Sequence, residues 1–283
     1  MTNGKITSRK NPLVQQARAV RDGHARELVF VEGVRLCEEA LRAGVDVESV
    51  LYTAALEESA SGSRLVEELR RICPRAFSVT ESVLESVADT TTSQGVVVLA
   101  RRPLTGAGVI VLGDVTPLIV IMHRANNPAN AGAMVRVAEA AGATAAVSTK
   151  GSTDLFSARA LRGSMGSAFR LPLWTGATLG ESLNFCAERG IRTVSTDATA
   201  NVAYTEIDWT MPRAVVVGPE AGGLTDAETH AADECVRIPM LAPVESLNVA
   251  VALGVILYEA ARQRGGSRRQ GQEAGGRRQV KPL

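Results

Sequence analysis

The apolar run LIVIM at residues 118–122 limits more than any other feature how this chain can fold. Such a run is typical of a central parallel strand, which is buried on both faces and so lacks the alternation of a half-exposed strand. A polar loop and a helical stretch, NAGAMVRVAEAAGA, follow it, as in a strand–helix crossover unit. Helical stretches also separate the later apolar runs, which predicts an α/β fold with a doubly wound, mostly parallel sheet built from TAAVST, IRTVST, AVVVG and CVRIP.

The N-terminal part predicts a second, smaller α/β domain. From Leu28 to about Arg102, strand-like runs such as LVFVEG and GVVVLA alternate with helical stretches such as SRLVEELRRIC, and a basic amphipathic helix precedes them. Pro and Gly punctuate residues 103–117. We therefore expect domains at residues 1–105 and 106–264. A disordered basic tail should follow at 265–283, because that stretch is rich in Gly and Arg and has no apolar face.

Composition narrows the partners and the compartment. Arginine carries almost all of the positive charge in a chain whose formal net charge is +1. Its planar guanidinium suits phosphate and so favours a nucleic-acid partner, but a GC-rich genome would explain the same usage. The four cysteines are scattered and form no C-x-x-C pair, so we expect no metal site. The N-terminus has no apolar signal core, and no apolar run approaches the roughly 20 residues that span a bilayer. We expect a cytoplasmic protein without a membrane partner.

Two common cofactor signatures are missing from the sequence. Neither the dinucleotide fingerprint G-x-G-x-x-G nor the phosphate loop G-x-x-x-x-G-K-[ST] occurs. Their absence argues against a nicotinamide dehydrogenase, a typical Rossmann methyltransferase and a P-loop nucleotidase. Three polar clusters remain, RANNPANAGAMVR, VVVGPEAGGL and IPMLAPVESLNVA, and each follows a predicted strand. Ligands bind at the carboxyl ends of strands in open α/β sheets, so these clusters are the candidate site.

Each cluster also has a simpler structural interpretation. Asn130 near a helix start would be explained by a helix cap, and Ser246 caps the final helix. Arg136, in contrast, stands among apolar neighbours that we expect to be buried, and a buried guanidinium needs an anionic partner such as phosphate. Asn248 would then be buried in the first turn of the last helix, which a cap does not explain. The turn around Gly218 has little side-chain bulk and lets backbone amides face a ligand.

Taken in order and spacing, these clusters resemble the three motifs of the SpoU/TrmH family of RNA ribose methyltransferases, part of the SPOUT group. The resemblance extends over residues 5–264. One departure is the loop Asn127-Pro128-Ala129-Asn130, where many members have Asp-Pro-Gly-Asn. The matching residues are Asn130, Gly132 and Arg136, then Arg162, Ser164 and Gly166, then Gly218, Glu220, Gly223 and Leu224, and finally Ile238, Pro239, Met240, Ser246, Leu247 and Asn248.

The resemblance implies a fold and an activity. The C-terminal domain would be a trefoil-knotted SPOUT domain, and the N-terminal domain would be similar to an RNA-binding ribosomal-protein fold. The expected activity is 2′-O-ribose methylation of RNA from S-adenosyl-L-methionine, with rRNA the first choice of substrate and tRNA the second. We expect a homodimer through the knotted domain, because the apolar last helix needs more cover than one sheet face gives.

The resemblance also implies roles for single residues. Arg162, together with Arg136, is expected to bind RNA. A guanidinium offers donors only, so we expect Arg136 to hold phosphate and the developing ribose oxyanion rather than to accept the ribose proton. The expected catalytic group is Arg136, Asn130, Glu220, Ser246 and Asn248. The expected cofactor-binding residues are Gly218, Ile238, Met240 and Leu247, with Ser195 or Thr196 nearby.

Two alternatives of other classes stay open. The altered Asn127/Ala129 loop would fit an RNA-binding protein that keeps the fold and has lost methyl transfer. A nucleotide-binding oxidoreductase is the third candidate, against which the missing glycine fingerprint counts.

Overall fold

The computed structural model describes the backbone of residues 5–272 and the side chains of residues 5–265. The chain divides into two units. The first comprises residues up to Thr105 together with residues 127–136 and 153–172, and the second comprises the remainder. The expected linear division places both short segments with the second domain instead. A division of the chain into domains at residues 1–105 and 106–264 stays a prediction.

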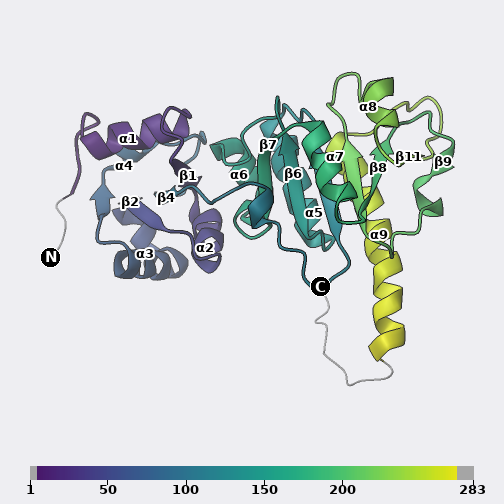
Figure 1. The fold of residues 1–283 in the computed structure, drawn as a ribbon. Coiled ribbons are helices and arrows are strands. Elements are labelled where there is room, and N and C mark those ends of the chain that lie inside the picture. Colours follow the sequence, from purple (N-terminus) through teal and green to yellow (C-terminus); the bar gives the residue numbers. More distant parts are fainter. Residues whose placement is uncertain (1–4, 273–283) are drawn as a thin grey trace. The chain divides into compact units, whose positions relative to one another are not determined.

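The first unit is built on a mixed sheet of four strands in the order β1-β4-β2-β3. β4 pairs antiparallel with β1 and β2, while β3 pairs parallel with β2. Figure 1 shows α1 and α4 on one side of this sheet and α2 and α3 on the other. The elements are α1 (Pro12–Arg21), β1 (Leu28–Glu32), α2 (Val34–Arg42), β2 (Val47–Thr53), α3 (Ala60–Ile72), β3 (Ala76–Val79), α4 (Glu81–Glu85), β4 (Val96–Arg101) and α6 (Ala158–Ser164).

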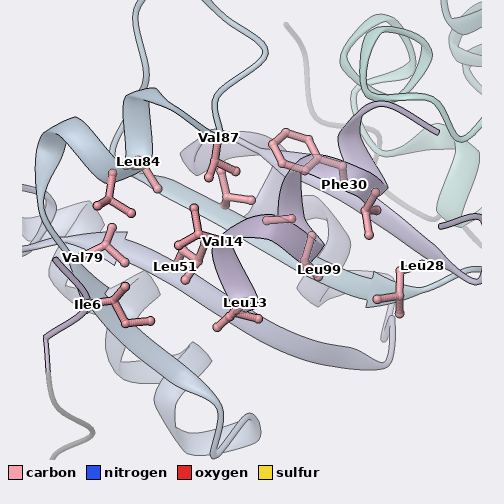
Figure 2. Packing of buried hydrophobic residues seen from close by; sticks show 14 of the residues in the cluster. Ile6, Leu13, Val14, Leu28, Phe30, Leu51, Val79, Leu84, Val87 and Leu99 are labelled. Carbon is pink, nitrogen blue, oxygen red and sulfur yellow. The ribbon is translucent and has the colours of Figure 1, made fainter. Parts of the chain in front are cut away.

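The core of the first unit follows from the apolar spacing of its helices and strands. The Asn11 side chain caps α1 by accepting a hydrogen bond from the Leu13 amide, and Pro12 occupies the first helical position. Leu13 and Val14 then face the sheet, where they meet Phe30 and the other inward side chains of the strands (Figure 2). Leu28 and Phe30, alternate residues of β1, thus belong to this core, and the residues between them are buried as well.

The second unit contains a sheet of seven strands in the order β7-β6-β5-β10-β8-β11-β9, in which every pair is parallel. All five residues of β5 are buried, as the run LIVIM predicts. The two edge strands β7 and β9 were not predicted from the sequence. The strands are β5 (Leu118–Met122), β6 (Ala145–Thr149), β7 (Leu173–Ala177), β8 (Arg192–Thr196), β9 (Val202–Ala203), β10 (Arg213–Val217) and β11 (Glu234–Arg237).

Helices complete the second unit. α7 (Leu179–Ala187) starts with a capping box between Thr178 and Glu181, and its Phe185 packs against the sheet core. α8 (Asp226–His230) is short, and α5 (Pro128–Ala140) begins in the first unit and ends in the second. No helix of the described range is long and apolar enough to cross a membrane.

The last helix, α9 (Val249–Gln272), corrects two expectations. It continues to Gln272, so residues 265–272 are helical, whereas the sequence was expected to begin a disordered tail at Gly265. Residues 273–283 lie outside the described residues. The helix is also less covered than its apolar sequence suggests, since Val251 is 54% and Tyr258 is 56% exposed.

Inside the first unit, α5 and α6 approach so closely that only glycine fits between them. A Cβ atom on Gly132 would lie 2.2 Å from the carbonyl oxygen of Ala160 and 2.9 Å from the amide nitrogen of Ser164. Both neighbours are backbone atoms and have no flexible end that could move away. The glycine of the first motif therefore has a packing role.

We expect Gly132→Ala to lower the free energy of unfolding by about 1–3 kcal/mol, the usual cost of overpacking. Gly180→Ala is the matched control, because Gly180 is also helical and a Cβ atom added there would meet no other atom within 4 Å. The control should be neutral or stabilising by up to about 1 kcal/mol, since alanine favours helix over glycine. Urea unfolding monitored by circular dichroism measures both, and equal stabilities would contradict the packing role.

Candidate active site

A cavity of about 630 Å³ opens at the carboxyl ends of β8, β10 and β11, in the second unit. Its volume lies in the range of small-molecule and cofactor sites. The first turns of α9 and the segment before them also line it. The lining residues are Thr196, Asp197, Ala198, Val217, Gly218, Pro219, Glu220, Gly222, Gly223, Leu224, Val236, Ile238, Met240, Ser246, Leu247, Asn248, Val249, Ala252 and Ile256.

The glycine-rich turn after β10 forms one wall of the cavity. A Cβ atom on Gly218 would lie 2.7 Å from the Leu224 amide nitrogen, so the turn folds back onto its own first residue. Gly222 and Gly223 both have positive φ, 81° and 63°, which side chains rarely tolerate. Glycines at these positions allow the turn to close tightly and to present backbone groups to the cavity.

The charge of the cavity wall is one-sided. Asp197 and Glu220 line it, and none of the described lining residues is Lys, Arg or His. The Asp197 Oδ1 accepts hydrogen bonds from the Thr199 hydroxyl and amide, both at 2.6 Å. These bonds lower the pKa of Asp197, the hydroxyl more than the amide, so the carboxylate is charged near neutral pH. Such a wall suits a cationic ligand.

Five of the six residues expected to bind a cofactor line this one cavity, and Ser195 does not. Ser195 is fully buried, and its hydroxyl donates to the carbonyl oxygens of Thr229 (3.1 Å) and Glu234 (3.2 Å). Successive residues of a strand point to opposite faces, so Ser195 and Thr196 cannot both face the cavity. The alternative Thr196 is the one that does. The residues brought together are Thr196, Gly218, Ile238, Met240 and Leu247.

The third cluster, around Ser246 and Asn248, differs from the expected arrangement at the start of α9. Asn248, not Ser246, caps α9, because its Oδ1 accepts hydrogen bonds from the amides of Ala250 (3.0 Å) and Val251 (3.3 Å). Asn248 is also exposed rather than buried in the first turn. The helix starts at Val249, later than the sequence suggests. Ser246, Asn248 and Glu220 all line the cavity, so three of the five expected catalytic residues lie together.

The other two expected catalytic residues, Asn130 and Arg136, belong to the first unit. The loop 127–130, whose sequence differs from the family motif, still has the geometry of a helix start. The Asn127 Oδ1 accepts hydrogen bonds from the amides of Ala129 (2.9 Å) and Asn130 (3.4 Å), so its amide side chain caps α5 as a carboxylate would. Asn127 is therefore the cap in place of Asn130, which lies in the first turn of the helix.

The arginines differ from the expected picture. Arg136 is exposed, although Met134 and Val135 beside it are buried, so the inference of a buried guanidinium is wrong. Adjacent helical residues face different sides, which explains the difference. Within the described residues no ion pair of Arg136 is formed. Arg162, in contrast, contacts Asp89 at 2.6 Å and approaches Glu32 to 3.9 Å. These two carboxylates already balance the charge of the Arg162 guanidinium. The RNA contact of Arg162 stays a prediction.

A polar cluster that the sequence analysis missed lies beside the cavity loop. The His123 Nδ1 lies 3.0 Å from the Thr149 hydroxyl and its Nε2 lies 3.0 Å from the Glu228 carboxylate. Arg124 donates to the same carboxylate at 2.8 Å. One available signal was the sequence Thr225-Asp-Ala-Glu228, a capping-box pattern directly after the glycine turn. Among the described residues, no group of His, Cys, Asp or Glu side chains is arranged to hold a metal ion.

The comparison with known families decides where this chain belongs. Residues 117–258 match the SpoU rRNA Methylase family, and residues 11–98 match the MRM3-like substrate binding domain. The chain belongs to the SpoU rRNA methylase family. The sequence resemblance is thereby confirmed, and the cavity described above falls inside the SpoU match.

Relatives of the SpoU family match three quarters of the chain or more. An uncharacterized tRNA/rRNA methyltransferase of Synechocystis is 32% identical over 91% of this chain and 93% of its own length. The 23S rRNA (guanosine-2′-O-)-methyltransferase RlmB of Bordetella pertussis is 32% identical over 76% of this chain and 89% of its own. The SpoU methyltransferase AviRb of Streptomyces viridochromogenes, solved with AdoMet, is 28% identical with a TM-score of 0.80, covering 90% of this chain and all of that one.

Proposed function

We propose that this protein transfers a methyl group from S-adenosyl-L-methionine to a ribose 2′-hydroxyl of RNA, with rRNA as the substrate. The observation that carries the proposal is the cavity at the carboxyl ends of β8, β10 and β11, lined by two carboxylates and, within the described residues, by no basic side chain. The relative RlmB acts as a 23S rRNA guanosine-2′-O-methyltransferase, which supports the substrate. The tRNA alternative remains an outcome of the test.

The cavity fits this cofactor better than a phosphorylated one. S-adenosyl-L-methionine carries a sulfonium and an ammonium group against one carboxylate, so acidic walls attract it. A dinucleotide would place its phosphates beside Asp197 and Glu220 with no cation to balance them. Apolar side chains such as Ile238 and Ile256 offer a surface for a purine ring. The charge of the wall therefore also counts against the oxidoreductase.

The residues divide into holding and orienting groups. Backbone groups of Gly218, Ile238 and Leu247 would hold the adenosine part, and Asp197 would accept a hydrogen bond from a hydroxyl or ammonium group. The bound donor supplies an electrophilic methyl group on a positively charged sulfur. The chain has no proton to move at that sulfur, so its task is to align the two reactants and exclude water.

We assign the target ribose and its phosphate to the exposed guanidinium of Arg136, which has a fixed charge and a planar fork. Asn130 and Ser246 would orient the nucleotide. Glu220 and Asn248 would maintain the loops, and Asn248 does so by capping α9. An RNA contact of Arg162 is also part of this proposal.

The proposal has further parts that concern architecture. The turn after Gly218 and the loop after Ile238 line one cavity, which supports the trefoil knot. The first unit would bind RNA, consistent with its match to a substrate binding domain. The exposed apolar side chains Val251 and Tyr258 on α9 support a homodimer through the second unit. An RNA substrate and four unpaired cysteines support the cytoplasm as its location.

The proposed function is tested by mapping ribose methylations in total RNA from cells with and without the gene by mass spectrometry. One rRNA 2′-O-methyl group should disappear on deletion and return when the gene is restored. Calorimetry with S-adenosylhomocysteine tests the pocket separately, and Asp197→Asn should weaken its binding. A protein that binds RNA but neither donor nor product would be the non-catalytic alternative, and loss of a tRNA methylation would redirect the substrate.

Arg136→Lys tests the role of the guanidinium, because lysine keeps the charge and loses the fork. We expect weaker RNA binding, a partial loss of single-turnover rate and nearly unchanged affinity for S-adenosylhomocysteine. A general base would behave differently: the rate in Arg136→Lys would rise about tenfold per pH unit up to the pKa of the new lysine, with RNA binding intact. Such a rise of the rate with pH would refute the proposed role of Arg136 in holding phosphate and ribose.

Sedimentation velocity at micromolar concentration tests the homodimer. Tyr258→Arg should shift the protein to monomer, since a charge would be buried at the centre of the proposed contact. Met211→Arg is the control, because Met211 is 54% exposed in the same unit but lies outside α9. A parent chain that sediments only as monomer would contradict the proposal.

A further inference from the structure

His123 contacts both ends of the glycine turn that walls the cavity. Its backbone amide donates to the carbonyl oxygen of Val217 at 2.8 Å, on the strand from which the turn leaves. Its Nε2 lies 3.0 Å from the carboxylate of Glu228, in the helix that the turn enters. One residue after β5 is thus connected to the beginning and to the end of the segment 218–224.

The Glu228 carboxylate is contacted by donors from two separate segments, His123-Arg124 and Thr225. Its Oε1 faces His123, while its Oε2 accepts from the Arg124 guanidinium at 2.8 Å and from the Thr225 amide at 2.9 Å. The Thr225 amide is the largest cause of a lowered pKa of Glu228, followed among the favourable contacts by His123. The carboxylate is therefore charged at neutral pH. It links the helix that follows the turn to the residues that follow β5.

The hydrogen bonds determine which nitrogen of His123 carries a proton. An ionised carboxylate only accepts, so the Nε2 that faces Glu228 must carry hydrogen. The Thr149 hydroxyl accepts from the Arg124 amide at 3.0 Å, and its one proton is nearer to Nδ1, at 3.0 Å between the heavy atoms, than to the Lys150 carbonyl oxygen at 3.4 Å. Both ring nitrogens have a partner in this arrangement, and the residue is only 7% exposed.

Arg124 contributes backbone strain to the same cluster. Its φ is 51°, in the left-handed region that costs a side-chain-bearing residue free energy. The hydrogen bond from its backbone amide to the Thr149 hydroxyl and its ion pair with Glu228 hold Arg124 in this conformation. Strain of this kind persists where the surroundings enforce it and is concentrated at functional sites.

We propose that His123, Arg124 and Glu228, which we call the clasp, are positioning residues that hold the turn 218–224 in the form that receives the cofactor. The clasp touches no reactant and acts by keeping both ends of the turn fixed before binding. An already ordered turn spares the cofactor the loss of loop entropy on binding. This inference rests on the proposed function of the same cavity.

Glu228→Gln is the first test, because glutamine is isosteric and still completes a capping box with Thr225 while losing the charge that faces Arg124 and His123. We expect the dissociation constant of S-adenosylhomocysteine to rise roughly tenfold, as when the competent form falls to about a tenth of the population. Hydrogen exchange of amides in 218–224 should accelerate in the cofactor-free protein. Glu181→Gln, which changes the capping box of α7 alone, is the matched control and should leave both readouts unchanged.

A pair of substitutions at His123 separates positioning from general stability. Glutamine reaches the place of Nε2 and keeps a donor towards Glu228, whereas asparagine reaches only the place of Nδ1 and Thr149. His123→Gln should bind S-adenosylhomocysteine with an affinity within about threefold of the parent. His123→Asn should lose as much affinity as Glu228→Gln, since only glutamine keeps the hydrogen bond to Glu228.

Two outcomes overturn the clasp. The first is unchanged affinity and loop exchange in Glu228→Gln. The second is a fall in affinity that parallels a fall in melting temperature and in exchange protection across the whole sheet, which would make the cluster a general stabiliser. Failure of the proposed function is distinguishable, because the parent itself would then bind no S-adenosylhomocysteine, while loop exchange in the cofactor-free protein would still report the clasp.

Discussion

The insertion of β10 between β5 and β8 is the constraint on which the rest of the second unit depends. Parallel pairing on both sides aligns the carboxyl ends of the neighbouring strands. The residue directly after each strand therefore arrives at the same edge of the sheet. His123 follows β5, Asp197 follows β8, Gly218 follows β10 and Ile238 follows β11. Three of these line the cavity and the fourth supports its wall, so the chemistry of the site is a consequence of strand order.

The strands that make this edge could be predicted because burial on both faces leaves a continuous apolar run, as in β5 and β10. The edge strand β7 lacks that signal. Its three middle residues, Trp174 to Gly176, are not fully buried, and it follows a segment with several glycines, which is typical of a loop. Edge strands need only one neighbour and one covered face, so their sequences carry weaker constraints than those of central strands.

Most residues of the second and third motifs were predicted to lie together and line one cavity, while the local roles of single residues were not predicted correctly. The family resemblance singled out Gly218, Ile238 and Leu247, which the structure brings to one cavity, and their part in binding stays a prediction. The cap of α9 fell on Asn248 instead of Ser246, since Asx and Ser side chains cap equally well and only backbone geometry chooses between them. The burial of Arg136 was misjudged for a related reason: apolar neighbours along the sequence are not neighbours in space on a helix.

Long-range polar pairs are the part that sequence reasoning cannot reach. His123 and Glu228 are separated by more than a hundred residues, and each has an ordinary explanation alone, as a residue after a strand and as the end of a capping box. Their meeting requires that β10, which carries the turn between them, pair with β5. The ion pair and hydrogen bonds then act back on the turn, because its two ends are fixed to one strand end. Strand pairing thus places the glycine turn, and the pair of residues that this pairing brings together limits how far the turn can open.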